Sequence, residues 1–299
     1  MRYLLLCVAV VLFCSCIKTD EGTIVKVIDV NYSTSSSFVI NGSIKGEIRD
    51  YNFLLKEFGN AKEKEIPAIG DRNDLYGFCY DLESDKAYLV SLFAVVNSDT
   101  IFSNEFKVET VQPITVTDLR DSNYYEVLKV GDQTWFAENA RFNTEGSCFY
   151  NNDSINYMQN GKFYTWEMAQ NVCPEGWHIP SDKEWLKLEL FLGMPEDYIN
   201  SFERPFNDNT ALTLLNFGFS YNLNSTVTNE YGFNVKATGT FNGEEFTNID
   251  NPAYYWTGSK TETNNGVAEI SRAISKDGSI GRYTTIQQSM MAVRCIKDE

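Results

Sequence analysis

Apolar and polar residues alternate in a series of short segments through the first third of the chain, most clearly at residues 25–28 and 38–40. A period of two is typical of β-strands that bury one face. Asn41-Gly42 and the residues around Gly70 are predicted to form turns between these segments. Short strands separated by turns indicate an all-β sandwich for residues 23–112.

A helical spacing replaces this alternation in the second half of the chain. Ser181 is followed three residues later by Glu184, the pair that forms a capping box at a helix N-terminus. The pattern predicts a helix from there to Gly193, with Trp185 and Leu188 on its buried face. Residues 113–299 are therefore expected to form an α+β domain.

A second helix is predicted upstream of the first. Trp166, Ala169 and Cys173 are spaced i, i+3 and i+7, which places them along one helix face. A strand-like run ends at Val111-Gln112-Pro113, and this is where we expect the boundary between the two domains.

The first residues of the chain have the pattern of a signal peptide. An uncharged apolar run covers residues 3–13, whereas a membrane-spanning helix needs about 20 apolar residues. The run ends at Phe13-Cys14-Ser15-Cys16, which resembles a lipobox. Residues 1–15 are therefore expected to be removed and Cys16 to carry the lipid anchor. An ordinary secretory cleavage nearby is the alternative.

Residues 16–22 would form a tether, and Lys18-Thr19-Asp20-Glu21 within it resembles the tag that directs Bacteroidetes lipoproteins to the cell exterior. The chain carries 41 acidic against 25 basic residues, a formal net charge of −16. Such an excess of negative charge opposes binding to nucleic acid, so no nucleic-acid partner is expected. The predicted location is the outer membrane, lipid-anchored and facing the exterior.

Leu82 and Tyr88 have the spacing of a tyrosine corner, in which the ring packs in the core and the hydroxyl bonds the upstream backbone. With the alternating strand that follows, this segment resembles a fibronectin type III domain. The resemblance implies that residues 104–109 form the last strand of that domain. Another sandwich of the same architecture is the alternative.

Several separated blocks in the second half closely resemble the Fibrobacter succinogenes major paralogous domain. The blocks occur in the family's order and span residues 116–298. They are QTWFAEN at 133–139, GKFYTW at 161–166, CPEGWHIPSDKEW at 173–185, YWTGS at 255–259 and VRCIKD at 293–298.

The two predicted helices with these blocks also resemble the core of C-type lectin-like domains, which have two helices and antiparallel strands. That resemblance implies a disulfide between Cys173 and Cys295. Closing a loop of about 120 residues would contribute about 4 to 5 kcal/mol in the chain-entropy model. Two buried free thiols are the alternative. Cys79 and Cys148 could bridge the domains or stay buried.

The segment around Trp177 also resembles formylglycine-generating enzymes, which use cysteines for catalysis. Here Cys173 and Cys295 are assigned to the disulfide, and a lone Cys148 without an obvious base is poor evidence for a nucleophile. The single histidine, His178, is expected to be structural. We therefore expect no enzyme activity and no cofactor, with such an oxidase as the alternative.

No metal site is expected either. Glu244-Glu245 and Asp250 could ligate calcium, but no Asp-rich loop of regular spacing is present. Lectins that hold sugars through calcium carry a Trp-Asn-Asp segment, and the corresponding residues here are Trp256-Thr257-Gly258.

What remains is a binding or adhesion module for a glycan or a protein. The residues between 196 and 251 are rich in Asn, Thr and aromatic side chains, and Tyr221, Tyr231, Phe233 and Trp256 are candidate ligand-binding residues. The alternative is that they fill the core. A structural subunit of a surface assembly is a further alternative for the whole chain.

Asp99-Thr100-Ile101 and Asp153-Ser154-Ile155 resemble the sites at which Bacteroidetes attach O-glycans to exported proteins. Thr100 and Ser154 are therefore candidate modification sites, each in a segment that is expected to be exposed.

Overall fold

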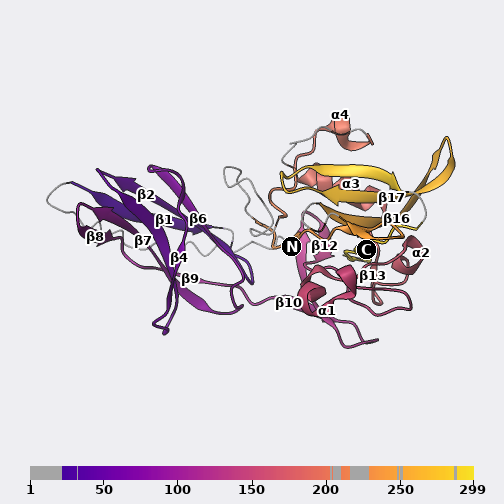
Figure 1. Ribbon diagram of the computed structural model, residues 1–299, viewed down its shortest axis with the longest axis horizontal. Helices are drawn as coiled ribbons and strands as arrows, with labels where there is room; N and C mark the ends of the chain where they lie inside the picture. The colour runs from indigo at the N-terminus through magenta and orange to yellow at the C-terminus, as the bar shows by residue number, and fades with distance from the viewer. Residues whose placement is uncertain are drawn as a thin grey trace, which may run out of the picture. The chain divides into compact units, whose positions relative to one another are not determined.

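The computed structural model is built mainly from antiparallel sheets with a few short helices (Figure 1). The chain separates into two compact units, of which the first includes Ile40–Gly77 and Ala87–Glu109 and the second includes Thr110–Glu299. Tyr32–Val39 and Phe78–Lys86 also belong to the second unit. The structure describes residues 22–31, 33–202, 204, 210–215, 229–247, 249, 252–285 and 288–299.

Two antiparallel sheets account for the strands of the first half, which confirms the prediction of an all-β region. One sheet has the strand order β1-β2-β6-β5, and the other has the order β4-β3-β7-β8 with β9 also paired to β7. The strands are β1 Ile24–Asn31, β2 Phe38–Lys45, β3 Asp50–Glu57, β4 Glu63–Ile66, β5 Ile69–Asp71, β6 Asp74–Cys79, β7 Ala87–Val96, β8 Asp99–Phe102 and β9 Phe106–Glu109.

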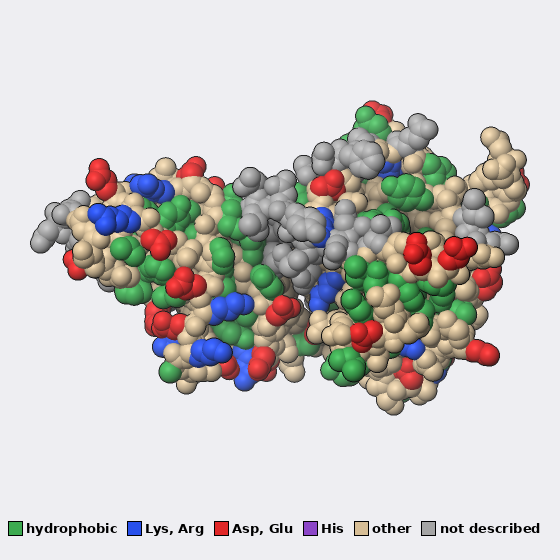
Figure 2. All heavy atoms as spheres, in the orientation of Figure 1, with side chains coloured by type: hydrophobic (Ala, Val, Ile, Leu, Met, Phe, Trp, Pro, Cys, Tyr) green, Lys and Arg blue, Asp and Glu red, His purple; other side chains and the backbone are tan. Residues whose placement is uncertain are grey.

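The predicted alternation is clearest in β7, where every second side chain is buried, among them Val90 and Leu92 at 0% exposure. At the surface, acidic side chains are scattered among basic ones on the face drawn in Figure 2. The other face of β7 is half-buried and mostly apolar, with Leu89 and Phe93 among its side chains, so neither face of this strand is fully open to water.

The predicted turn at Asn41-Gly42 is wrong, because both residues lie inside β2. A Cβ atom at Gly42 would stand 2.9 Å from a ring carbon of Phe53, so this glycine permits close packing of a neighbouring side chain. Gly70 likewise lies within β5, and the turn follows at Arg72-Asn73.

Three sheets form the second unit. The largest has the order β10-β11-β12-β19-β13, the second is β16-β17-β18, and the smallest pairs β14 with β15. The strands are β10 Ile114–Thr117, β11 Tyr124–Val130, β12 Gln133–Phe136, β13 Trp177–His178, β14 Thr240–Phe241, β15 Phe246–Thr247, β16 Ala253–Thr263, β17 Gly266–Ile274, β18 Ile280–Thr285 and β19 Ile296–Lys297.

The helix predicted after Ser181 is α3, Asp182–Phe191, and both hydrogen bonds of its capping box are present. Gly193 adopts φ +96 just beyond its end, a conformation that glycine reaches without strain. The other short helices are α1 Ser154–Tyr157, α4 Glu196–Ile199 and the 3-10 turns η1 Tyr150–Asn152 and η2 Met158–Asn160.

The upstream helix is shorter than predicted. It is α2, Trp166–Ala169, so Cys173 lies beyond its end rather than on its face. Arg120 terminates this segment by donating to the carbonyl oxygens of Asn171 at 3.0 Å and Val172 at 2.6 Å. A side chain distant in sequence thereby satisfies carbonyls that a longer helix would have paired.

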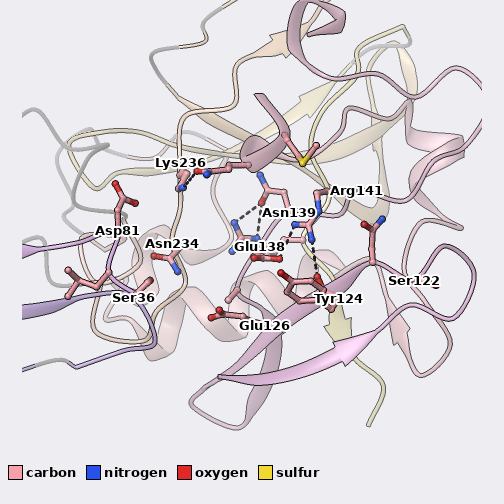
Figure 3. A pocket seen from close by; sticks show the side chains of 16 residues that line it. Ser36, Asp81, Ser122, Tyr124, Glu126, Glu138, Asn139, Arg141, Asn234 and Lys236 are labelled. Carbon is pink, nitrogen blue, oxygen red and sulfur yellow. Dashed lines mark hydrogen bonds and ion pairs between the residues drawn. The ribbon is translucent and has the colours of Figure 1, made fainter. Parts of the chain in front are cut away.

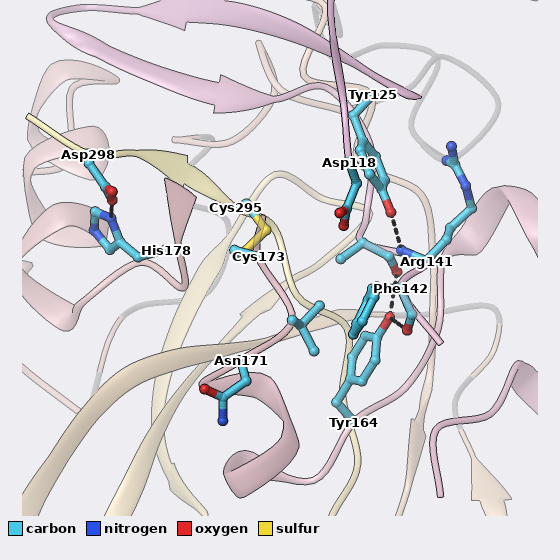
Figure 4. Close-up of a disulfide and its surroundings, with 12 residues drawn as sticks. Asp118, Tyr125, Arg141, Phe142, Tyr164, Asn171, Cys173, His178, Cys295 and Asp298 are labelled. Carbon is cyan, nitrogen blue, oxygen red and sulfur yellow. Dashed lines mark hydrogen bonds and ion pairs between the residues drawn. A yellow bond between two sulfur atoms is a disulfide. The ribbon is translucent and has the colours of Figure 1, made fainter. Parts of the chain in front are cut away.

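The disulfide between Cys173 and Cys295 is confirmed, with 5.8 Å between the two Cα atoms (Figure 4). Cys295 is fully buried in a core cluster with Tyr125, Phe136 and Trp256. Among the described cysteines, Cys79 and Cys148 form no disulfide. The bond therefore ties the chain just after α2 to the start of β19.

A buried charge network attaches α3 to the β17-β18 hairpin. Glu189, at 0% exposure, accepts from Arg272 at 2.5 Å and from Arg204 at 2.8 Å. Asp182 accepts from Arg272 at 2.8 Å and from Arg282 at 2.7 Å. Burial alone would raise the pKa of Asp182, but the bonds from the arginines outweigh it and the pKa is lowered.

His178 connects β13 to the C-terminus and to α3. Its Nδ1 lies 2.6 Å from an oxygen of Asp298, and its Nε2 lies 2.8 Å from an oxygen of Glu184. Partial burial lowers the pKa of His178, but the two carboxylates raise it by more, so the pKa lies above its ordinary value.

We expect Glu189→Leu to lower the free energy of unfolding of the second unit by about 3 to 5 kcal/mol, because it leaves the buried Arg204 without a carboxylate and Arg272 with only Asp182. Urea unfolding measures the change. Glu175→Gln removes an exposed carboxylate and serves as the control. An equal effect of the two substitutions would contradict a stabilising role for the network.

We expect the second unit to lose stability as the pH rises above about 6.5, the ordinary pKa of histidine. A raised pKa in the folded protein stabilises fully below the unfolded pKa, and that stabilisation is lost as the pH passes the folded pKa. His178 is the only histidine of the chain, so His178→Gln should remove this slope in unfolding curves from pH 6 to 8. A slope that persists in the variant would disprove the assignment.

Candidate functional site

A pocket of about 870 Å³ opens in the second unit, beside β11 and the segment that follows β12 (Figure 3). Its lining includes three carboxylates and three cationic side chains, so its formal charge is balanced although the whole chain is strongly acidic. The charged residues are Asp81, Glu126, Glu138, Arg141, Lys236 and Arg294.

Main-chain hydrogen bonds fix the wall formed by residues 136–141. The amide of Phe136 donates to the oxygen of Cys295 at 2.9 Å, and the amide of Ala140 donates to Val293 at 2.8 Å. The amide of Ala137 donates to the oxygen of Glu126 on β11 at 2.8 Å. The wall is thereby held on one side by the disulfide-bonded segment and on the other by the sheet.

Arg294 forms the floor of the pocket and is 1% exposed. Its Nε and Nη2 donate to the side-chain oxygen of Asn139 at 2.9 and 2.6 Å, and Nη1 donates to the carbonyl of Phe233. The guanidinium also lies over the ring of Phe233, 4.7 Å from its centroid. Burial lowers the pKa of Arg294, and its bonds join three segments that are distant in sequence.

Arg141 organises the rim. Its guanidinium pairs with Glu138 at 2.9 Å and donates to the carbonyl of Tyr124 at 2.9 Å. Its main-chain amide donates to the hydroxyl of Tyr125 at 2.9 Å, and burial raises the pKa of that hydroxyl to about 12. The Tyr124 side chain is 64% exposed, so an aromatic ring borders a polar pocket.

Glu126 lies on the same strand as Tyr124, two residues on, and therefore on the same face. Burial raises the pKa of Glu126, the hydrogen bond from Ser35 opposes this, and the charge of Glu138 adds to it. The lining thus offers carboxylate acceptors, amide groups from Asn139 and Asn234, and cationic donors. It contains neither histidine nor cysteine, so the described residues suit binding by hydrogen bonds and ring contact.

Comparison with known proteins identifies the part of the chain that holds this pocket. Residues 128–297 match the Fibrobacter succinogenes major domain, which is more than half of the chain. The chain belongs to this family. The Fibrobacter succinogenes major domain thus contains the disulfide and most of the residues that line the pocket.

Solved structures add little to this identification. The sensor domain of the anti-sigma factor RsgI4 from Pseudobacteroides cellulosolvens is 14% identical over 33% of this chain and 83% of that chain, with a TM-score of 0.26. A shorter form of that domain is 16% identical over 31% of this chain and 98% of that chain, with a TM-score of 0.27. No curated protein matches the chain.

The predicted ligand-binding residues do not meet at this pocket. Phe233 is fully buried beneath Arg294, and Trp256 is 2% exposed and lines a different hollow. Tyr231 is partly buried against Phe191, with 5.8 Å between the ring centroids. Tyr221 lies outside the described residues, as does Cys16.

The pocket residues that the sequence pattern did not indicate include two on β11 and others at the end of a family block. Glu138 and Asn139 close the block QTWFAEN, and Arg294 lies inside VRCIKD. These polar residues stand within blocks that otherwise consist of core residues, and this contrast could have indicated a binding site. No such contrast marks Tyr124 and Glu126, because their strand has an ordinary composition.

The candidate modification residues are both exposed. Thr100 lies in β8, and Ser154 is the first residue of α1, where Asp153 caps the helix. Within the described ranges, no group of three or more His, Cys, Asp or Glu residues could hold a metal ion. No described helix is long and apolar enough to cross a membrane.

We expect Arg294→Lys to destabilise the Fibrobacter succinogenes major domain by about 1 to 3 kcal/mol, because an ammonium cannot replace the forked bonds to Asn139 and Phe233. Thermal unfolding measures the effect, and Arg49→Lys at an exposed position is the matched control. Equal melting temperatures for the two variants would contradict this role of Arg294.

Proposed function

We propose that this chain is a lipid-anchored outer-membrane protein, exposed at the cell surface, that binds a glycan or protein ligand without catalysing a reaction. The observation that carries the proposal is the 870 Å³ pocket, with its balanced charge and its exposed ring of Tyr124. Binding sites of this kind combine apolar contact with a few fixed polar groups. The anchor is proposed at Cys16.

We also propose a C-type lectin-like fold for the second unit. Its support is that β12, near the start of the unit, pairs with β19 at its end. A further support is the disulfide, which joins the segment just after α2 to the residue before β19. In such a scaffold, loops and strand ends carry ligand while the paired termini hold the core.

A fibronectin type III-like fold is proposed for the first unit. Its support is the division into one sheet with the order β1-β2-β6 and a second with the order β4-β3-β7. Tyr88 follows Leu82 by six residues and is buried, as a tyrosine corner requires.

The cysteine chemistry supports a non-catalytic role over a formylglycine-generating oxidase. Cys173 and Cys295 are bonded to each other. Burial raises the pKa of the Cys148 thiol, and the opposing effect of Lys162 is smaller. A thiol with a raised pKa is less often the thiolate that attacks a substrate.

We expect a soluble form of the chain beginning at Ile17 to bind a defined ligand on a glycan array or a panel of surface proteins. Tyr124→Ala should weaken that binding about tenfold through loss of ring contact. Tyr283→Ala, at an exposed tyrosine of β18 outside the pocket, should leave the affinity unchanged. Affinity that is unaffected by Tyr124→Ala, or oxidant-dependent modification of a cysteine peptide, would contradict the proposal.

A further inference from the structure

A second hollow of about 370 Å³ lies between α2 and the β16-β17 hairpin, and it shares no residue with the first pocket. Its lining includes two indole rings, from Trp166 and Trp256, and two carboxylates, from Glu167 and Glu269. Among the described residues that line it none is cationic, but the ammonium of Lys260 lies against two of them. The lining is therefore aromatic and acidic, and Lys260 beside it offsets one of the two negative charges.

The protein's own Lys260 already lies against this lining. Its ammonium lies 4.0 Å from the centroid of the Trp166 ring and 2.9 Å from one oxygen of Glu269. The side chain of Glu269 is only 6% exposed. An ammonium between an indole face and a buried carboxylate combines a cation–π contact with a charge-assisted hydrogen bond.

A β-bulge creates this arrangement. The register of β16 against β17 shifts between Trp256 and Lys260, and pairing resumes with Lys260 opposite Glu269. Within the shifted stretch, the carbonyl of Thr257 accepts the indole N–H of Trp166 at 2.9 Å. Bulges re-aim side chains at sheet edges and binding sites, and this one brings the ring, the carboxylate and the ammonium together.

The indole N–H groups are already engaged, since that of Trp256 donates to the carbonyl of Tyr164 at 2.7 Å. Trp256 is 2% exposed, so the ring that a ligand can reach is that of Trp166, through its π surface and edges. A cation uses such surfaces, and the carboxylates of Glu167 and Glu269 complement its charge. An indole face beside carboxylates suits a ligand with a positively charged group.

We propose that this hollow is a second ligand site and that it takes the side chain of a lysine from a partner protein, with Lys260 competing for Glu269. A lysine is the ligand class because the ammonium already held there ends a lysine side chain. The proposal stands on residues separate from those of the first pocket, so either can fail without the other.

The test uses the chain beginning at Ile17 with ¹⁵N-labelled tryptophan, so that the indole signal of Trp166 reports on the site and Trp166→Phe assigns it. The probe is Nα-acetyl-lysine methylamide, and its Nε-acetylated form is the neutral counterpart. We expect a saturable shift with the charged probe and at least tenfold weaker binding of the neutral one.

Two substitutions separate a ligand site from a cross-strand ion pair. Lys260→Met should tighten binding at least fivefold because it removes the competing ammonium, and Glu269→Gln should weaken it at least tenfold. Glu262→Gln, at an exposed position of β16, the strand of Lys260, should leave the affinity for the probe unchanged. Melting curves establish whether each variant is folded. If Glu269→Gln does not fold, the affinity of Lys260→Met for the probe tests the proposal.

Three results would overturn the proposal. The first is no saturable shift in either the unaltered chain or Lys260→Met. The second is equal affinity for the charged and the acetylated probe, which would show ring contact without charge recognition. The third is tighter binding of methyl glucosaminide than of the lysine probe, which would assign the hollow to an amino sugar instead.

Discussion

The second unit depends on the pairing of one extended segment, residues 290–297, with several segments that are far apart in the sequence. The main chain of Met291 exchanges hydrogen bonds with Tyr164 in both directions, at 3.0 Å each. Ala292 bonds β16, and Ile296 pairs with both β12 and β13. Because each pairing satisfies groups that would otherwise be buried without partners, the elements around this segment are positioned by it.

The side chains of the same segment add two different constraints. Cys295 closes a long covalent loop, which limits the unfolded chain, and Arg294 makes forked hydrogen bonds that only the folded chain can complete. The floor of the first pocket is thus part of the scaffold itself. The wall of the pocket donates hydrogen bonds to the carbonyls of Cys295 and Val293, so this segment also fixes the position of the wall.

Charged groups are used in three ways in this unit. Glu189, Arg204 and Arg272 are buried, and their ion pairs hold α3 against the β17-β18 hairpin. The first pocket keeps its charges balanced, which suits a polar, uncharged ligand. The lining of the hollow beside Trp166 is acidic, and its buried carboxylate pairs with the ammonium of Lys260. Burial and pairing, more than net charge, separate these roles.

The sequence by itself determined what depends on near neighbours. The alternation in β7 and the capping box of Ser181 and Glu184 are interactions within a few residues, so the pattern predicted them. It failed at Asn41-Gly42, where a turn signal lies inside a strand because Phe53 of another strand needs the space. The disulfide was predicted through family resemblance, which carries tertiary information that local spacing lacks.

The tertiary structure alone decided the candidate sites. Asn139 and Arg294 are separated by 155 positions, and Trp166 and Thr257 by 91, so no local pattern connects them. Phe233 is an aromatic residue of the kind that often binds ligands. Arg294 lies over its ring, however, and Phe233 is a buried core residue. Whether an aromatic or charged side chain binds a ligand or packs inside depends on which distant segments cover it, and only folding settles that.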